Sequence, residues 1–123
     1  MAPPSQPARK VLFVEDEAAL QYSYQRFFKG KYDMAYAPTG AEAMRQLDSF
    51  EPDVLVLDMR LPDTDGIALL QRIREKRPPL PGIVTTAYVS MEPLINVLDL
   101  GPSRYLLKPY ELTELAAAID AAG

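Results

Sequence analysis

Short apolar runs alternate with longer amphipathic segments along this chain, and this alternation limits its possible folds more than any other feature of the sequence. The runs are three or four residues long, and they lie at 11–14, 34–37, 54–57, 83–85 and 105–107, the second being the weakest. Runs this short and this continuously apolar are typical of parallel strands that are buried on both faces.

The intervening segments have the spacing of amphipathic helices, with apolar side chains three or four residues apart. In the first three segments the residues predicted to face inward are Ala19, Leu20, Tyr24, Phe27 and Phe28; Ala43, Met44, Leu47 and Phe50; and Ile67, Leu70, Ile73 and Arg74. A fourth helix is expected between Ser90 and the Gly101–Pro102 pair. A fifth is expected from about Glu111 to the alanine-rich end of the chain.

Local signals support the bounds of the second and third helices. Thr39 and Glu42 have the spacing of a capping box, which predicts the start of the second helix. Pro52 and the proline-rich segment 78–81 follow the second and third helices. Because proline cannot continue the hydrogen-bond ladder of a helix, both helices are expected to end before these residues.

Five strand–helix units in strict alternation predict an α/β fold, a single doubly wound five-stranded parallel sheet with helices on both faces. Residues 9–123 are expected to form this one domain. The first eight residues include three prolines and little that can be buried, so 1–8 is predicted to be a flexible tail. Sheets of this kind bind ligands beyond the carboxyl ends of their strands, so chemistry is expected from the residues that follow each strand.

Composition excludes several classes of protein. The 123 residues include no histidine, which rules out Ser-His-Asp hydrolases, HExxH zinc enzymes and phosphohistidine carriers. They also include no cysteine, which rules out disulfides and thiolate metal sites and agrees with a cytoplasmic location. The net charge of −4 argues against direct binding of nucleic acid. No apolar run approaches the ~18 residues that a membrane span needs.

Charged and hydroxyl side chains follow four of the predicted strands. Glu15 and Asp16 come after the first strand, Asp58 after the third, Thr86 at the end of the fourth and Lys108 after the fifth. Since the carboxyl ends of parallel strands lie at one edge of a sheet, these side chains are expected to meet there.

This set of side chains suits metal-assisted phosphoryl transfer. Three crowded carboxylates repel one another, and a divalent cation together with one lysine would offset their charge. Magnesium prefers an all-oxygen site made of one or two carboxylates, waters and a phosphate. A carboxylate such as Asp58 beside this metal can attack a phosphoryl group and form an aspartyl phosphate.

Taken alone, each of these residues has an ordinary structural interpretation. Glu15 and Asp16 could cap the next helix, and Asp58 could open a turn. Thr86 could be a β-branched strand residue, and Lys108 a solvated charge. Their joint occurrence at consecutive strand ends favours the functional interpretation.

Four segments in this order and spacing resemble the receiver (CheY-like) domain of two-component response regulators. They are VLFVEDE, VLVLDMRLPDTDG, TTAY and YLLKPY, and the resemblance extends over nearly all of residues 10–122. It implies a flavodoxin-like (βα)5 fold with strand order 2-1-3-4-5. It also implies a phosphoprotein of phosphorelay signal transduction, which is not an enzyme beyond catalysing its own phosphorylation and dephosphorylation.

The resemblance assigns a role to each acidic residue. Asp58 would accept a phosphoryl group from the phosphohistidine of a cognate histidine kinase or histidine phosphotransfer protein. Asp16 would bind Mg2+ directly, Glu15 would do so through water, and Asp58 and the backbone carbonyl of Arg60 would complete the protein ligands. Glu15 departs from the aspartate that is most common in the family, and its longer side chain is expected to alter metal affinity rather than abolish function.

The resemblance also implies a conformational switch. Thr86 and Lys108 would bind the phosphoryl oxygens, and the rotamer of Tyr105 would follow the movement of Thr86. Ala87 matches a position that is kept small so that phosphate can enter, and Pro109 matches a proline whose preceding peptide bond is usually cis. Signalling would pass through the face formed by the fourth helix, fifth strand and fifth helix to a downstream protein or a fused output domain.

Two further departures concern the entrance of the site and the partner face. Arg60 and Tyr88 occupy positions expected to tune the lifetime of the phosphoryl group. The segment Gly101–Arg104 differs from the commoner Gly-Ala-x-Asp, which weakens the match to the subfamily that dimerises through an acidic residue there.

Three alternative functions fit these residues less well. A related α/β phosphatase or phosphomutase usually has a second aspartate two residues after its nucleophile, and here that position is Arg60. A flavin or nucleotide binder would need a glycine-rich or hydroxyl-rich phosphate loop, which the segments after the strands lack. A pseudo-receiver that is not regulated by phosphorylation would not need the complete set of Asp58, Thr86 and Lys108.

Overall fold

A computed structural model of the chain describes residues 8–86 and 103–122. The strands are β1 (Lys10–Val14), β2 (Asp33–Ala37), β3 (Val54–Asp58), β4 (Gly82–Thr86) and β5 (Ser103–Leu107). The helices in these ranges are α1 (Ala18–Phe28), α2 (Gly40–Phe50), α3 (Gly66–Lys76) and α5 (Leu112–Ala121). The predicted fourth helix, Ala87, Tyr88 and all but the last residue of the predicted tail lie outside the described residues. None of the helices in the described part is long and apolar enough to cross a membrane.

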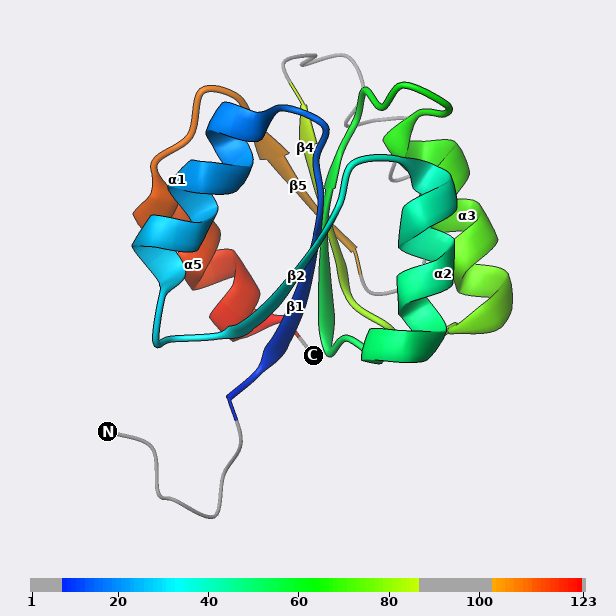
Figure 1. Cartoon of the computed structure of the whole chain (residues 1–123), viewed down its shortest axis with the longest axis horizontal. Coiled ribbons are helices and arrows are strands. Elements are labelled where there is room, and N and C mark those ends of the chain that lie inside the picture. Colours follow the sequence, from blue (N-terminus) through cyan, green and yellow to red (C-terminus); the bar gives the residue numbers. More distant parts are fainter. Residues whose placement is uncertain (1–7, 87–102, 123) are drawn as a thin grey trace.

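The described strands form one parallel sheet in the order β2-β1-β3-β4-β5. Figure 1 shows α1 and α5 on one face of this sheet and α2 and α3 on the other. This is the doubly wound flavodoxin-like fold with the predicted order, in which β1 and β3 lie side by side and the chain then continues toward β5. The carboxyl ends of all the strands therefore lie at a single edge.

Alternate side chains of each central strand enter two separate apolar cores, as the period of a strand requires. Toward α2 and α3 the sheet contributes Leu12, Val14, Leu55, Leu57 and Val84. Toward α1 and α5 it contributes Val11, Phe13, Val54, Val56 and Ile83. Burial on both faces explains why these runs are continuously apolar in the sequence. The prediction of buried parallel strands is confirmed for β1, β3 and β4, whereas the edge strand β2 is only partly buried.

The Thr39 N-cap and the Pro52 stop of α2 are present as predicted, whereas the Glu42 side chain does not complete the predicted capping box. The Thr39 hydroxyl accepts a hydrogen bond of 3.1 Å from the backbone N–H of Glu42 at the start of α2. The Glu42 carboxylate contacts the side chain of Arg45. Helix α2 ends at Phe50 with Glu51 in the left-handed region at a φ of 53°, directly before Pro52.

The predicted inward face of α1 was wrong for Phe27 and Ala19. Phe27 is 47% exposed and Ala19 is also exposed, whereas Tyr24 and Phe28 are the buried residues of this helix. Tyr24 and Phe28 are one turn apart, and Phe27 lies about 100° around the helix from Phe28. Phe27 therefore packs edge-on against the Phe28 ring, at 5.0 Å between centroids, instead of against the sheet.

Candidate functional site

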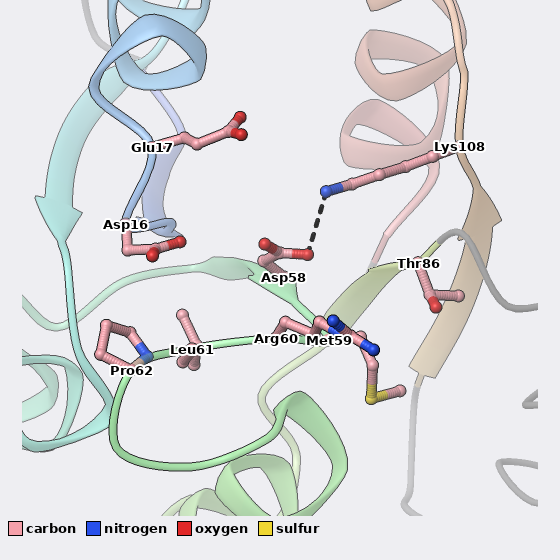
Figure 2. A pocket seen from close by; sticks show the side chains of 9 residues that line it. All are labelled: Asp16, Glu17, Asp58, Met59, Arg60, Leu61, Pro62, Thr86 and Lys108. Atoms are coloured by element: carbon pink, nitrogen blue, oxygen red, sulfur yellow. Dashed lines mark hydrogen bonds and ion pairs between the residues drawn. The ribbon is translucent and has the colours of Figure 1, made fainter.

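The carboxyl edge of the sheet carries a cavity of about 490 Å³ that gathers most of the predicted site residues (Figure 2). Its lining residues are Asp16, Glu17, Asp58, Met59, Arg60, Leu61, Pro62, Thr86 and Lys108. They come from the ends of β1, β3, β4 and β5 and from the loops that follow. The register of the sheet places Asp58 opposite Thr85 and Thr86 opposite Leu107, so the ends of β3, β4 and β5 are level.

Asp58 and Lys108 form an ion pair across this cavity. Asp58 is the last residue of β3 and is 9% exposed, and its Oδ1 lies 3.1 Å from the Nζ of Lys108. The backbone N–H of Lys108 donates to the carbonyl of Thr86 at 2.6 Å, which fixes the start of the lysine's loop beside β4. Burial alone would lower the pKa of Lys108, but the hydrogen bond and charge of Asp58 outweigh it and raise that pKa. Lys108 is therefore an ammonium ion at neutral pH.

Glu15, Asp16 and Asp58 form an acidic cluster in which one oxygen from each residue lies within 4.8 Å of the others. Glu15 is only 2% exposed, whereas Asp16 is open to solvent. The Oε2 atom of Glu15 accepts a hydrogen bond of 3.1 Å from the N–H of Glu17. Its Oε1 atom is buried and has no hydrogen-bond partner among the described residues.

Burial is the main reason why the pKa of Glu15 rises from 4.5 to about 7. The negative charge of Asp58 acts in the same direction, while the Glu17 N–H and the Lys108 ammonium act against it. A carboxylate in this position needs a cation to remain charged at neutral pH.

The two predicted switch residues differ in their distance from the cavity, since Thr86 lies at the end of β4 and Tyr105 two residues before the end of β5. Thr86 ends β4, is almost fully buried and lines the cavity. Tyr105 is half-buried on β5, where it pairs with Val84 and packs against the core under α2 and α3. The peptide bond between Lys108 and Pro109 is cis, as the resemblance implied.

Comparison with known proteins decides the family. The family model described as "Response regulator receiver domain" matches residues 11–120, which is nearly the whole chain. The chain belongs to this family. It is thus a receiver domain of two-component response regulators.

Curated relatives and solved structures agree with this assignment. Over 112 residues the receiver domain is 38% identical to the transcriptional regulatory protein TrcR of Mycobacterium tuberculosis, covering 89% of this chain and 43% of that protein. Over 113 residues it is 33% identical to the DNA-binding transcriptional regulator NtrC of Escherichia coli, covering 91% of this chain and 24% of that protein. The chain thus spans less than half the length of these two relatives.

Two solved receiver domains show the same fold. The receiver domain of Francisella response regulator 1452 superimposes with a TM-score of 0.80 and 32% identity, over 91% of this chain and 93% of that one. The non-phosphorylated HemR receiver domain of Leptospira biflexa gives a TM-score of 0.79 and 30% identity, over 91% of each chain.

The acidic cluster of the receiver domain has the chemistry of a site for a hard divalent cation. Its three carboxylates carry three negative charges and Lys108 carries one positive charge, which leaves two negative charges when all are ionised. Oxygen donors alone suit Mg2+, and a buried carboxylate oxygen without a hydrogen-bond partner is a suitable ligand or acceptor for a metal-bound water. The residues present therefore fit magnesium.

Sequence reasoning missed several parts of the site. Glu17 and the loop residues Leu61 and Pro62 line the cavity, although the motif was interpreted only through Asp58 and Arg60. The adjacent cavity of about 500 Å³ involves Tyr110, which follows Lys108 and Pro109. The position of Tyr110 directly after the Lys-Pro pair could have indicated its place beside the site. The places of Leu61 and Pro62 could not be predicted, because they depend on how the loop after β3 folds back toward the sheet edge.

Proposed function

We propose that this receiver domain accepts a phosphoryl group on Asp58 from a phosphohistidine of a partner histidine kinase or histidine phosphotransfer protein. The observation that carries the proposal is the position of the Asp58 carboxylate. It is paired with the Lys108 ammonium at 3.1 Å, belongs to the cluster with Glu15 and Asp16, and lies at a cavity that a phosphoryl group can enter.

The transfer needs little from the protein beyond placement and charge. A carboxylate oxygen of Asp58 forms a bond to phosphorus as the bond from phosphorus to the histidine nitrogen breaks, and the released imidazole takes up a proton. Lys108 and the Thr86 hydroxyl would bind oxygens of the transferred group. In this role Lys108 would exchange its present partner, the Asp58 carboxylate, for phosphoryl oxygens.

Magnesium would be held by Asp16, Asp58 and the backbone carbonyl of Arg60, with Glu15 acting through water. When bound, it would supply positive charge to the carboxylates and to the oxygens of the transferring group. Glu15 and Asp16 can share a metal ion with Asp58 because they directly follow β1, which lies next to β3 in the sheet.

The partners of the domain follow from its relatives as part of the proposal. TrcR and NtrC are named as transcriptional regulators and are longer than this chain, which supports a kinase upstream and an output domain or protein downstream. The signal would leave through the face formed by the predicted fourth helix, β5 and α5. Such a pathway would place the domain in the cytoplasm.

Intact-mass measurement after incubation with magnesium and acetyl phosphate, a small phosphodonor, tests the assignment of Asp58. The wild type is expected to gain one phosphoryl adduct, and Asp58→Asn is expected to gain none because the amide is not a nucleophile for this reaction. Asp53→Asn is a matched control, since Asp53 precedes β3 at the opposite edge of the sheet. An equal adduct on wild type and Asp58→Asn, or none on either, would overturn the proposal.

A further inference from the structure

The loop between β3 and α3, residues 59–65, folds back on itself. Gly66 N–H donates to the Met59 carbonyl at 2.7 Å, and inside this pair Leu61 N–H donates to the Thr64 carbonyl at 3.1 Å. These bonds leave Pro62 and Asp63 at the tip of a compact turn. These hydrogen bonds lie within the turn, so any link between its tip and the rest of the protein must come from the side chains of the tip.

Asp63 attaches this tip to the start of α2. Its Oδ1 accepts a hydrogen bond of 2.8 Å from Gly40 N–H, and its Oδ2 accepts one of 3.0 Å from Ala41 N–H. The first N–H groups of a helix have no partners within the helix and attract negative charge. Thr39 binds the N–H of Glu42, so Asp63 supplies from a distant loop the two caps that the local sequence does not.

The contact between this loop and α2 is both charged and close. The Gly40 and Ala41 N–H groups lower the pKa of Asp63, which is therefore ionised at neutral pH. A Cβ atom on Gly40 would lie 2.7 Å from the Thr64 methyl carbon and 3.3 Å from the Asp63 Oδ1. Glycine at position 40 thus lets the loop approach the helix.

The loop that Asp63 holds is also one wall of the phosphoacceptor cavity. Arg60, Leu61 and Pro62 line the cavity directly between Asp58 and Asp63. Leu61 packs against the core under α2 and α3, so the side chains of Leu61 and Asp63 restrain the loop through separate contacts. Removing the Asp63 carboxylate would remove both hydrogen bonds that join the tip to α2, while the hydrogen bonds within the turn would remain.

We propose that Asp63 is a positioning residue for the magnesium site, which by capping α2 fixes the loop that supplies the Arg60 carbonyl. The inference rests on the proposed function, because it assigns Asp63 to the metal site of that function. Asp63 itself would contact neither the magnesium ion nor the phosphoryl group. The start of α2 thereby becomes part of the support of the site.

Calorimetric titration of the full chain with MgCl2 alone tests this inference. Asp63→Ala is expected to weaken magnesium binding by about tenfold, the lower end of the effect of outer partners at metal sites. Asp63→Asn keeps one acceptor oxygen of similar reach, so it is expected to fall between Asp63→Ala and the wild type. Asp53→Ala is the matched control, because the exposed Asp53 accepts a hydrogen bond of 2.8 Å from the Lys10 N–H at the opposite sheet edge.

Each outcome of the titration has a distinct meaning. Unchanged affinity in both Asp63 variants, with magnesium binding by the wild type, would overturn this inference and leave the proposed function standing. A loss in Asp53→Ala equal to that in Asp63→Ala would also overturn it, because the effect would then follow general stability. No binding by the wild type would overturn the proposed function and this inference together. If Asp63→Ala does not fold, Asp63→Asn decides the matter by the same comparison.

Discussion

The burial of Glu15 has a cost to stability when no cation is bound beside it. The fold buries its side chain against Asp58, and one of its oxygens has no hydrogen-bond partner among the described residues. Neighbouring Asp16 is exposed and can approach a cation from the solvent side. Charge on Glu15 is therefore expensive without a cation, and the folded protein keeps the proton of this side chain to about pH 7.

Replacing Glu15 with glutamine is expected to change how stability depends on pH when metal is removed with a chelator. In the unfolded wild type Glu15 releases its proton near pH 4.5, but the folded protein holds it to about pH 7. The folded state thus binds more protons in this window, and its stability should fall as pH rises from 4.5 to 7, by roughly 3 kcal/mol. Glu15→Gln should lack this part of the fall. Urea unfolding at pH 4.5 and 7.5 measures it.

The comparison between the two proteins isolates Glu15 from other titrating groups. Magnesium should restore stability to the wild type at pH 7.5 and have less effect on Glu15→Gln, since ligands stabilise the state they bind. Identical pH dependence in the two proteins without metal would show that Glu15 is not buried as described.

The sequence was sufficient to predict which residues meet at the site, but not how each one is placed. Asp58, Thr86 and Lys108 were predictable because parallel strands end at one edge. Glu15 and Asp16 follow the same strand, and which of them turns inward depends on the path of the loop into α1. The Asp63 caps could not be predicted because Asp63 and Gly40 are joined only by the tertiary fold.

At the scale of elements, two tyrosines connect α1 to the loop that carries Lys108. Tyr24 is 1% exposed, stacks on Phe13 at 4.7 Å between ring centroids, and hydrogen-bonds through its hydroxyl to the hydroxyl of Tyr110. Burial and this hydrogen bond both raise the pKa of Tyr24, so it is neutral. Tyr110 is half-buried and lines the cavity beside Lys108, where water can reach it.

Removing the Tyr110 hydroxyl is expected to lower the free energy of unfolding more than removing the Tyr24 hydroxyl. Tyr110→Phe leaves the buried Tyr24 hydroxyl without this partner and should cost about 1–3 kcal/mol of unfolding free energy. Tyr24→Phe leaves a hydroxyl that can bind water and should cost about 0.5–1.5 kcal/mol. The double variant should be more stable than Tyr110→Phe alone, because no buried hydroxyl then lacks a partner. Urea unfolding of the three variants measures these differences, and strictly additive losses would contradict the pairing.

The elements themselves were the most predictable part of the fold. Every predicted strand is present with bounds that differ by two residues or fewer. For β1, β3 and β4 the reason is double burial, which makes a continuous apolar run that few other structures produce. The face of α1 was less predictable. Its aromatic residues at 24, 27 and 28 satisfy helical spacing in more than one way, and only packing against β1 shows that Tyr24 and Phe28 turn inward.

At the scale of the whole molecule, the residues of the site are in direct contact with the end of β5. Lys108 pairs with Asp58 through its side chain and with Thr86 through its backbone N–H. Thr86 and Leu107 are register partners in β4 and β5, and Tyr105 is two residues back along the same edge strand. Helix α2 lies over the other half of the sheet, on the face away from α1 and α5 (Figure 1).

Phosphorylation is therefore expected to change amide hydrogen exchange unevenly across the molecule. A phosphoryl group adds up to about two negative charges beside Lys108 and Thr86, which can shift the balance between arrangements that differ by a few kcal/mol. Amides in residues 86–106 should change their exchange rates, whereas those of residues 44–50 in α2 should not. Helix α2 packs mainly against β1 and β2, and it is the start of the helix, at Gly40 and Ala41, that is bonded to the loop 59–65. Mass spectrometry of the protein with and without a phosphodonor measures this, with Asp58→Asn as the control. Unchanged exchange at 86–106 in a fully phosphorylated sample would show that this face does not transmit the signal.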